Sequence, residues 1–353
     1  MTTVAVLGAG IMASALTFPL AENGDDVRLV GTHLDRDLID SLQRTGVHPG
    51  LGLAVNPAVR AYQLEDAPRA FEGADVAMSG VNSFGVHWAG RQFARLLRPG
   101  MRVLSITKGM EADDEGTLRI LPDVMRSLVP ADVADGVTWS AVVGPSIAGE
   151  VAVHRDTCVV FCGEDQVSLD GLADLFRTPY YHVWTSTDFV GHEVGAAVKN
   201  IYAFAAGFGQ GLLDREGEAE ARYRRFNYGA AVFAEGQKEI RQFVSMLGGR
   251  PETADGLGGV GDMFVTSMGG RNVRAGRYVG AGIPFSEVRG RLMKGVTLEG
   301  VHAISVIGAA LERLTERGLV GASDFPLCRH LYRVVEQDAP IDMPFEEFFG
   351  GMR

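Results

Sequence analysis

Val4-Ala-Val-Leu7, followed directly by Gly8-Ala-Gly10-Ile-Met-Ala13, is the stretch of sequence that decides the fold. A short β-forming run leads into a Gly-x-Gly-x-x-Ala turn, and a helical pattern begins within the turn. In such a turn the first glycine permits the tight bend, the second lets a pyrophosphate approach the backbone, and the small third residue lets the helix pack against the strand. The first helical N–H groups then face the anion. We therefore expect a dinucleotide site lined by Gly8, Gly10, Ile11, Met12 and Ala13.

The chain alternates between two kinds of pattern before it settles into one. After the opening strand, β-rich runs separated by helical patterns extend from Val27 to Val30, Val76 to Val81, Arg102 to Thr107, Trp139 to Val143, Thr157 to Phe161 and Tyr181 to Trp184. From about Asp188 only helical stretches follow: Gly191 to Ala206, Tyr223 to Leu247, Ser286 to Met293, Leu298 to Arg317 and Leu327 to Glu336. The alternation predicts an α/β fold, with a Rossmann-type doubly wound sheet in residues 1–187 and an all-α C-terminal domain in residues 188–353.

Composition excludes several classes of partner. The 353 residues include 33 Lys and Arg against 44 Asp and Glu, a net charge of -11. This charge repels nucleic acid and anionic lipid surfaces, so an anionic ligand must be held by local groups. The chain opens without the basic and apolar regions of a signal peptide, and it lacks a run of about 20 apolar residues. We expect a cytoplasmic protein that does not insert into a membrane or bind nucleic acid.

Cysteine and histidine do not indicate a metal site or a disulfide framework. The three cysteines, Cys158, Cys162 and Cys328, are odd in number and lack paired metal-ligand spacing. Strand alternation places Cys158 and Cys162 on one face, where we expect them to serve as small hydrophobic side chains. The eight histidines form no paired motif either, so we predict no metal.

The end of the second predicted strand bears on the choice of dinucleotide. An Asp or Glu about 20 residues beyond the glycines usually holds the ribose hydroxyls of NAD. The segment Arg28-Leu-Val-Gly-Thr32-His33-Leu-Asp35-Arg36 has no acid at the expected point. Thr32, His33 and Arg36 are able to accept a 2′-phosphate, which tilts the prediction weakly toward NADP, although Arg36 also fits the first turn of a solvated helix. NAD and NADP both remain open.

Two lysines are suited to reduction of a ketone, which requires a proton donor and a cationic group near the developing oxyanion. Lys108 follows the run Arg102 to Thr107 at the sheet edge where ligands collect, although a lone lysine there is most often solvated. Lys199 lies in an otherwise apolar helix and needs an acidic partner or a ligand. Asp262 offers a carboxylate in a glycine-rich segment that continues to Gly269-Gly-Arg-Asn272. This segment fits either a phosphate site or a helix cap with one surface arginine.

These segments together resemble the NAD(P)-dependent glycerol-3-phosphate dehydrogenase family over nearly the whole chain. Six motifs occur in the family's order: Gly8-Ala-Gly-Ile-Met-Ala13, Thr107-Lys-Gly109, Gly144-Pro-Ser-Ile-Ala-Gly-Glu150, Lys199-Asn200, Gly259-Val-Gly-Asp262 and Gly270-Arg-Asn272. A late Leu298-Glu-Gly-Val301 and a closing Phe325-Pro-Leu327 are also similar. Six ordered motifs are far more specific than any one of them.

The resemblance implies three catalytic residues. Lys199 matches the central acid/base lysine, Lys108 matches the lysine beside the substrate, and Asp262 matches the carboxylate that orients and balances Lys199. Nicotinamide C4 would deliver hydride to a C2 carbonyl while Lys199 donates the proton and Lys108 helps to polarise the oxygen.

It also implies two sets of binding residues. Side chains and backbone around the substrate match Asn200, Thr266, Gly270, Arg271 and Asn272, of which Arg271 and Asn272 grip the phosphate. The cofactor-facing positions match Ala148, Arg271 and Glu299, in addition to the glycine turn.

The activity implied is reversible reduction of dihydroxyacetone phosphate by NAD(P)H to sn-glycerol 3-phosphate, which feeds phospholipid synthesis. The enzyme would be an oxidoreductase that acts on a CH–OH group. A homodimer formed through the helical half is a further possibility, because its helices are strongly apolar, although internal packing accounts for that equally well.

Several departures from the family pattern keep other functions open. The usual Val-Pro-Ser segment is Val81-Asn-Ser83, a common lysine is Gly149, and Glu235 replaces a frequent arginine after Asn227-Tyr-Gly229. A carboxylate that pointed into a phosphate site would weaken binding, and it would also suit additional hydroxyls.

One alternative is therefore a paralogous dehydrogenase of a larger phosphorylated polyol or ketose. A second is a non-catalytic NAD(P)-sensing protein, against which the retained lysines argue. A third is a β-hydroxyacid dehydrogenase, against which the Gly-x-Gly-Asp and Arg-Asn segments favour a phosphate ester.

Overall fold

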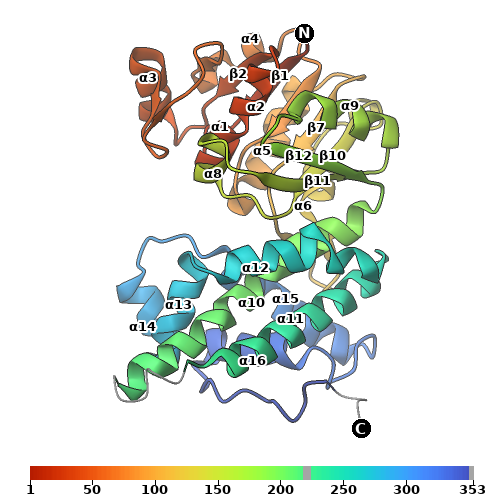
Figure 1. Ribbon diagram of the computed structural model, residues 1–353. Coiled ribbons are helices and arrows are strands. Elements are labelled where there is room, and N and C mark those ends of the chain that lie inside the picture. Colours follow the sequence, from red (N-terminus) through yellow and green to blue (C-terminus); the bar gives the residue numbers. More distant parts are fainter. Residues whose placement is uncertain (218–223, 350–353) are drawn as a thin grey trace. The chain divides into compact units, whose positions relative to one another are not determined.

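The computed structural model describes residues 1–217 and 224–349, which form two compact units (Figure 1). Unit 1 comprises Met1–Lys108 and Ile120–Phe189, and unit 2 comprises Gly109–Arg119 and Val190–Arg353. The segment Gly109–Arg119 therefore belongs to unit 2, although in the sequence it lies between the two parts of unit 1.

Unit 1 is built on an eight-stranded sheet in the order β12-β11-β10-β7-β6-β1-β2-β5. The strands are β1 (Thr3–Leu7), β2 (Asp26–Val30), β5 (Arg60–Tyr62), β6 (Val76–Ser79), β7 (Arg102–Ser105), β10 (Thr138–Val143), β11 (Thr157–Gly163) and β12 (Tyr181–Ser186). Neighbours run parallel except β10 and β11, which are antiparallel. The strand order reverses at β1, which confirms the predicted doubly wound sheet.

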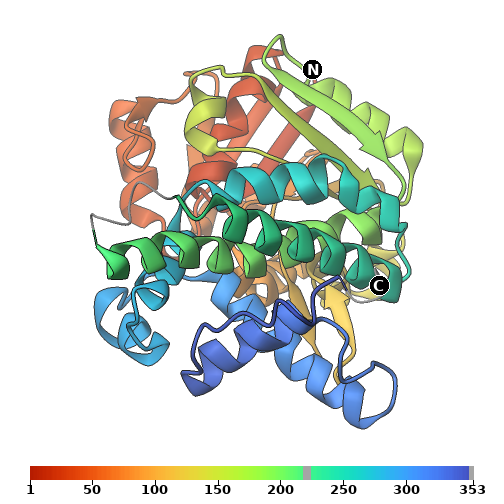
Figure 2. The ribbon, with the colours of Figure 1, turned by 60° about the horizontal axis from the view of Figure 1, so that its bottom comes forward.

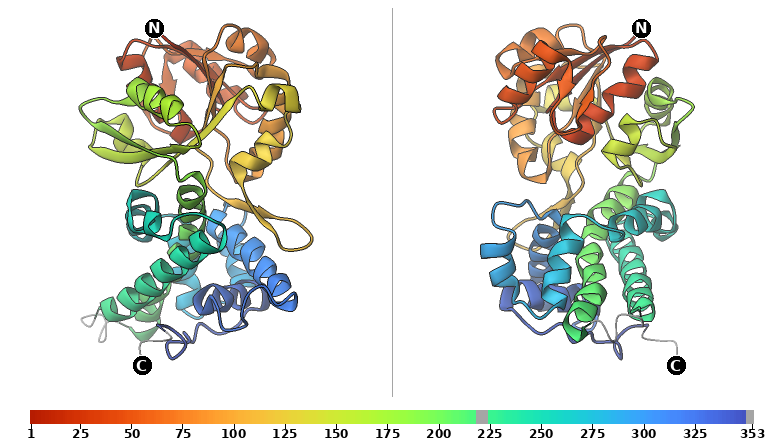
Figure 3. Two further views of the ribbon diagram at one scale, coloured as in Figure 1. Left: turned by 90° about the vertical axis from the view of Figure 1, so that its right-hand side faces the viewer. Right: turned by 60° about the vertical axis from the view of Figure 1, so that its left-hand side comes forward.

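Helices cover both faces of this sheet, as Figure 3 shows. They are α1 (Ile11–Ala15), α2 (Thr17–Glu22), α3 (Arg36–Thr45), α4 (Ala67–Phe71), α5 (Val86–Leu96), α6 (Leu121–Arg126), α7 (Ala131–Ala134), α8 (Ala148–Ala152) and α9 (Gln166–Phe176). Because both faces are covered, the central strands are apolar throughout, and the side chains of Val4–Leu7 are fully buried. This double burial explains why the strands appear in the sequence as continuous apolar runs.

All seven predicted strands are present, and the structure adds shorter ones. β5 is only three residues long and lacks a clear period, so the sequence pattern did not reveal it. A small hairpin formed by β3 (Val47–His48) and β4 (Leu53–Ala54) follows α3. Its importance lies in His48, which contacts the glycine turn.

Unit 2 consists mainly of helices, among which α10 and α11 lie side by side (Figure 2). They are α10 (Phe189–Glu216), α11 (Phe226–Met246), α12 (Asp262–Ser267), α13 (Arg271–Gly280), α14 (Phe285–Glu287), α15 (Glu299–Glu316) and α16 (Pro326–Gln337). This confirms the predicted α-helical second half. Part of α10 forms the interior of the unit, since the side chains of Ile201, Phe204 and Phe208 are fully buried.

One hairpin, formed by β8 (Met110–Ala112) and β9 (Leu118–Ile120), joins these helices (yellow in the left view of Figure 3). It lies against α15, where the guanidinium of Arg313 donates to the carbonyl oxygen of Asp113 at 3.1 Å. Gly116 has a φ of +86°, and a Cβ there would lie 3.0 Å from the carbonyl oxygen of Ala310. Among the residues that the structure describes, the regular elements of unit 2 are therefore helices and this one hairpin, which an earlier part of the sequence supplies.

The glycine-rich segment after α11 contains helices that the sequence patterns did not predict. It contains a π-helical turn (Leu257–Gly261) that continues into α12, and α13 begins soon afterwards. The many glycines hide these helices from a propensity-based prediction. The predicted stretch from Ser286 to Met293 is the short α14 and a π-helical turn (Val288–Leu292).

Glycines bring the backbones of α10 and α13 into direct contact. A Cβ on Gly276 would lie 1.8 Å from the carbonyl oxygen of Phe204, and one on Gly207 would lie 2.1 Å from that of Val273. A similar contact joins Gly211 to the carbonyl oxygen of Arg277. The absence of side chains at these positions is what allows the two helices to pack so closely.

Two further predictions concern particular segments. The charged segment Asp214–Arg225 includes the end of α10, while its residues 218–223, and with them the predicted helix start at Tyr223, lie outside the described residues. Cys158, Cys162 and Cys328 form no disulfide with one another; Cys162 and Cys328 are buried and Cys158 is half-buried.

Candidate functional site

The glycine turn between β1 and α1 is formed by close backbone contacts. Gly8 has a φ of +107°, and a Cβ there would lie 2.9 Å from the carbonyl carbon of Gly80, which follows β6. A Cβ on Gly80 would in turn lie 2.5 Å from the carbonyl oxygen of Gly8 and 2.6 Å from the side chain of Ala13. The small residues at 8, 13 and 80 therefore keep the turn compact at the carboxyl end of the sheet, where Gly10 precedes the exposed side chain of Ile11.

Two residues that the motif did not include hold the peptide of Ala9. The carboxylate Oδ2 of Asp35 accepts the Ala9 N–H at 3.3 Å, and Nε2 of His48 lies 3.1 Å from the Ala9 carbonyl oxygen. Asp35 precedes α3 and His48 is buried in β3. Sequence reasoning missed both, because the contacts are long-range and neither residue belongs to a motif.

The three residues predicted near a 2′-phosphate have different environments. The hydroxyl of Thr32 donates to Asp35 Oδ2 at 2.8 Å, and the ring of His33 lies 5.6 Å from that of Trp88, centroid to centroid. Arg36 forms an exposed ion pair with Glu65. An exposed pair contributes little stability, so Arg36 can exchange this partner for a ligand at small cost.

Lys108 lies beyond the carboxyl end of β7, at the end of the first of the two segments that form unit 1. Its Nζ donates to the carbonyl oxygen of Gly144 at 3.2 Å. Gly144 follows β10 with a φ of +119°, and Ala148, the predicted cofactor contact, begins α8 shortly afterwards. These residues and the glycine turn all follow the carboxyl ends of parallel strands, which is where open α/β sheets bind ligands.

Lys199 and Asp262 form a buried ion pair in unit 2. Lys199 on α10 and Asp262, the first residue of α12, have side chains that are 5% and 4% exposed. Gly195, one turn earlier on α10, lies beside the backbone of Gly258, where a Cβ would be 3.4 Å from the carbonyl oxygen. The hydroxyl of Thr266 donates to the Asp262 carbonyl oxygen at 2.7 Å, within α12. Burial makes each charge dependent on the other, since an isolated charge in such a place is strongly destabilising.

The predicted substrate residues of α10 and α13 meet at the start of α15. Asn272 accepts the N–H of Gly300 through Oδ1 at 3.1 Å. A Cβ on Gly300 would lie 2.3 Å from the carbonyl oxygen of Asn200. Gly300 follows Glu299, so that the predicted residues of three separate helices converge here.

Arg271 lies at the N-terminus of α13. It is exposed and is preceded by Gly270, which has a φ of +101°. The first N–H groups of a helix lack intrahelical acceptors, and together with a guanidinium they form an anion-binding arrangement. Arg271, Asn272, Asn200 and the Lys199–Asp262 pair are thus all parts of unit 2. They belong to α10, α12 and α13, which Figure 1 labels.

Glu235, the acid that replaces a frequent family arginine, is satisfied within unit 2. It is fully buried on α11, where the Lys238 ammonium lies 2.9 Å from its carboxylate and Phe349 donates a backbone N–H to it at 3.2 Å. The Glu235 carboxylate is therefore paired with Lys238 of its own helix and hydrogen-bonded to the backbone of Phe349. The other two positions that differ from the family pattern affect only their surroundings. Asn82 caps a 3-10 turn by accepting the N–H of Gly85, and Gly149 is exposed.

The cavities of the two units differ in their lining. Unit 2 has a largely apolar cavity of about 580 Å³ beside α10, α11 and α12. It includes Tyr202, one turn after Lys199, and Met263, next to Asp262, together with the partly exposed Phe226, Phe264 and Met268. Five hydrogen-bonding side chains also line it: Tyr202, Gln210, Arg224, Arg225 and Ser267.

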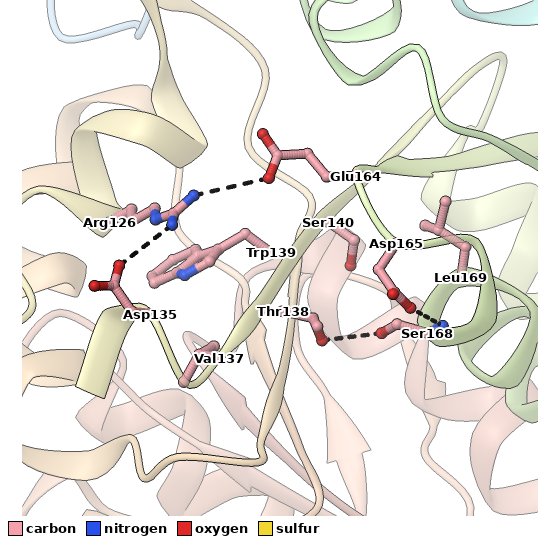
Figure 4. Close-up of a pocket in the computed structure, with 10 residues that line it drawn as sticks. All are labelled: Arg126, Asp135, Val137, Thr138, Trp139, Ser140, Glu164, Asp165, Ser168 and Leu169. Atoms are coloured by element: carbon pink, nitrogen blue, oxygen red, sulfur yellow. Dashed lines mark hydrogen bonds and ion pairs between the residues drawn. The ribbon is translucent and has the colours of Figure 1, made fainter. Parts of the chain in front are cut away.

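A smaller cavity of about 160 Å³ in unit 1 is polar (Figure 4). Arg126 there lies 3.5 Å from the carboxylate of Asp135 and 3.9 Å from that of Glu164, and the hydroxyls of Thr138 and Ser168 are 2.9 Å apart. Thr138 begins β10, so this cavity lies at the opposite edge of the sheet from the glycine turn. None of the predicted site residues lines it.

Across residues 1–217 and 224–349, no group of three or more His, Cys, Asp and Glu side chains has an arrangement that would hold a metal ion. Over the same residues, no helix has the length and apolar character needed to cross a membrane.

Comparison with known proteins relates both halves of the chain to one family. The family profile described as the N-terminus of NAD-dependent glycerol-3-phosphate dehydrogenase matches residues 3–168, and the profile of its C-terminus matches residues 188–346. The first range includes the glycine turn and Lys108, and the second includes Lys199, Asp262 and Arg271.

Individual relatives match over almost their full length. An NADP(+)-dependent glycerol-3-phosphate dehydrogenase of Archaeoglobus fulgidus is 31% identical over 339 residues, which cover 96% of each chain. A glycerol-3-phosphate dehydrogenase (NAD(P)+) of Geobacter sulfurreducens is 32% identical over 344 residues, covering 96% of this chain and 93% of the relative. The crystal structure of glycerol-3-phosphate dehydrogenase from Coxiella burnetii has a TM-score of 0.78 at 27% identity and covers 98% of this chain and 97% of that one.

Proposed function

The chain belongs to the NAD-dependent glycerol-3-phosphate dehydrogenase family, and on that premise we propose how its residues carry out the family's reaction. The protein is an oxidoreductase that acts on a CH–OH group with NAD or NADP. Its reaction is reversible hydride transfer between the nicotinamide and C2 of dihydroxyacetone phosphate or sn-glycerol 3-phosphate. The observation that supports the catalytic assignment best is the buried Lys199–Asp262 pair beside Asn200.

Lys199 holds and transfers the proton in this proposal. Burial beside Asp262 keeps its ammonium in one place and excludes water from it. In the reductive direction Lys199 Nζ gives a proton to the substrate oxygen, and in the oxidative direction it takes the proton back. Asp262 balances and orients the ammonium through the ion pair.

Lys108 and the glycine turn are contributed by unit 1. Lys108, fixed through the carbonyl oxygen of Gly144, polarises the substrate oxygen as negative charge develops there. The backbone of the glycine turn, from Gly8 to Ala13, fits a pyrophosphate because its small residues leave the approach open. A bound nicotinamide supplies and receives the hydride.

The remaining cofactor assignments are the predicted ones. Thr32, His33 and Arg36 lie near the adenosine ribose, and Ala148, Arg271 and Glu299 face the cofactor. The relatives include both NADP(+)- and NAD(P)+-dependent enzymes, so either dinucleotide fits.

The phosphate of the substrate is bound at the start of α13. Arg271 and the N–H groups after Gly270 provide positive potential in a protein whose net charge is -11. Asn272, Asn200 and Thr266 complete the substrate contacts. Residues 1–187 would thus form the dinucleotide-binding domain and residues 188–353 the domain that binds substrate.

The decisive experiment measures oxidation of NADH and of NADPH by the purified protein. The substrates are dihydroxyacetone phosphate, a series of larger ketose phosphates and unphosphorylated dihydroxyacetone. Turnover confined to dihydroxyacetone phosphate supports the proposal. Turnover only with a larger phosphate identifies a paralogous activity, and dinucleotide binding without turnover identifies a sensor.

We also propose a cytoplasmic location and a homodimer formed through unit 2. The exposed apolar side chains of Phe226, Phe264 and Met268 support association, and the net charge argues against nucleic acid as a partner. Light scattering coupled to size exclusion tests the dimer, and a monomer at all concentrations contradicts it.

A further inference from the structure

The peptide that links the two glycines of the turn is held at both of its polar atoms. The N–H of Ala9 donates to Asp35 Oδ2 at 3.3 Å. The Ala9 carbonyl oxygen accepts from the hydroxyl of Ser14 at 3.1 Å and lies at the same distance from Nε2 of His48. Side chains from three separate elements therefore determine how this peptide is oriented.

The partners of His48 determine its tautomer. A carbonyl oxygen only accepts hydrogen bonds, so Nε2 carries the hydrogen that points to Ala9. The backbone N–H of Leu51 donates to Nδ1 at 3.1 Å, so Nδ1 has no hydrogen. The imidazole, which is fully buried, acts as a neutral hydrogen-bond donor rather than as a cationic ligand for phosphate.

Asp35 and His48 are themselves held in place by their surroundings. Asp35 Oδ2 also accepts the backbone N–H and the hydroxyl of Thr32, both at 2.8 Å. His48 lies in a hairpin whose Gly50 packs on Ile11, since a Cβ at Gly50 would lie 3.0 Å from the Ile11 side chain. The hairpin and the loop between β2 and α3 thus both support the turn.

We propose that His48 and Asp35 are positioning residues for dinucleotide binding. They orient the Ala9 peptide so that the N–H groups that follow it, starting at Gly10, face the pyrophosphate. The Ala9 N–H already donates to Asp35, so it does not donate to the pyrophosphate. This inference rests on the proposed function, because it assumes that the turn binds a dinucleotide.

The proposal predicts an effect that is equal for NAD and NADP. The two cofactors share the pyrophosphate and differ only at the 2′-phosphate of the adenosine ribose. Loss of one buried hydrogen bond to the turn should weaken binding of both by about tenfold. A residue that binds the 2′-phosphate would instead weaken NADPH alone.

The experiment measures the Kd of NADH and NADPH by quenching of protein fluorescence, together with the KM values and kcat. In His48→Leu we expect both Kd values to rise about tenfold, with kcat and the KM for the ketone substrate within about twofold of wild type. His48→Gln retains an N–H donor and should restore most of the affinity. Asp35→Asn, which retains an acceptor for the Ala9 N–H, should likewise bind NADH more tightly than Asp35→Ala. For this pair the readout is the Kd of NADH, because Asp35 also holds Thr32, which is predicted to lie near the 2′-phosphate of NADPH.

Ser140→Ala provides the matched control. Ser140 is a buried residue of unit 1 whose hydroxyl donates to the Val103 carbonyl oxygen at 2.6 Å, on a strand distant from β1 in the sheet order. Its loss removes a buried hydrogen bond of the same type and should leave both Kd values unchanged. Thermal unfolding of each variant shows that the compared proteins are folded.

Three results would overturn the inference. These are unchanged dinucleotide affinity in folded His48→Leu, weaker binding of NADPH alone, and equal loss of affinity in His48→Gln and His48→Leu. A wild-type protein that binds neither dinucleotide would refute the proposed function itself. The binding measurement does not require turnover, so the two failures are distinguishable.

Discussion

The ammonium of Lys199 and the carboxylate of Asp262 face each other inside unit 2, with less than a tenth of either side chain exposed. One residue lies in the middle of a long helix and the other begins a short one, so the pair also connects α10 to α12. Burying two charges in this position costs free energy of desolvation, which the rest of the fold has to offset. Each of its members therefore affects both chemistry and stability.

Lys199→Ala should reduce kcat by about 10²- to 10⁴-fold, because it removes the proton donor and acceptor. The Kd for NADH should stay close to the wild-type value, since the glycine turn belongs to unit 1. Lys294→Ala, an exposed lysine of unit 2, is the control and should turn over normally. Turnover of Lys199→Ala within about tenfold of wild type would refute the assignment.

Asp262→Ala should destabilise the protein by about 3–5 kcal/mol, because it leaves the Lys199 ammonium buried without its partner. The free energy of unfolding in urea measures this loss. Adding the second change, Lys199→Met, should recover part of the stability without recovering activity. Lys199→Met alone provides the reference for this comparison. If it lowers the free energy of unfolding by the same amount in wild type and in Asp262→Ala, the two side chains are not coupled.

Arg271→Gln should raise the KM for dihydroxyacetone phosphate by about 10- to 100-fold, the range expected when a hydrogen bond to a charged group is lost. The activity with unphosphorylated dihydroxyacetone should change far less, so the variant discriminates less between the two substrates. Arg274→Gln, one turn later on α13 and also exposed, is the matched control. An equal loss of activity with both substrates would show that Arg271 does not bind the phosphate.

Gly276→Ala should lower the free energy of unfolding by about 1–3 kcal/mol or more, because the new methyl group overlaps the backbone of α10 at Phe204. It should also raise the KM for the phosphorylated substrate, since α13 has to move and carries Arg271 with it. Gly290→Ala, which has open space around the position, serves as the control in the same unit. Wild-type stability in Gly276→Ala would contradict the close helix contact.

The stability of the protein should depend on pH through Glu239, whose carboxylate is fully buried on α11. Burial raises the pKa of Glu239 to about 8 from its ordinary 4.5, against hydrogen bonds from the Tyr202 hydroxyl and the N–H groups of Leu327 and Cys328 that lower it. Between these two values the folded protein holds a proton that the unfolded chain has lost. The free energy of unfolding should therefore fall as the pH rises from about 4.5 to about 8.

A second buried group acts in the opposite direction at lower pH. Burial lowers the pKa of His330 from 6.5 to about 4. The stability that the neutral His330 contributes is therefore lost as the pH falls from about 6.5 to about 4. Between pH 6.5 and 8, outside the range of His330, the pH dependence of the free energy of unfolding in urea therefore reports on Glu239. Glu239→Gln should flatten the profile in that range, and a slope equal to that of wild type would show that Glu239 does not titrate there.

Prediction from the sequence succeeded where the determining interactions are local. The glycine turn and the seven strands depend on residues that are adjacent in the chain, and double burial of the sheet makes each strand a visible apolar run. The order of the six motifs was sufficient to identify the family, because order over 353 residues is far more restrictive than any one motif. The roles of Lys199, Lys108 and Arg271 remain predictions.

It failed where the determining contacts join distant segments. His48 reaches Ala9 across 39 positions, and its own neighbours contain no feature that distinguishes it from an ordinary core histidine. The helix α13 contains Gly276 and Gly280, which lower its helix propensity, yet it forms because those glycines allow contact with α10. Tertiary packing overrides local preference at these positions.

The β8–β9 hairpin also limits how the protein can be divided. Residues 190–353 expressed alone would lack this hairpin, leaving the backbone groups and the surface of α15 near Ala310 and Arg313 exposed to water. Residues 1–189 alone would instead carry the hairpin without the helix on which it rests. To separate the two units into independent polypeptides, the hairpin therefore has to be cut out of the first part, and Lys108 joined directly to Ile120. The hairpin then has to be linked to the helical part.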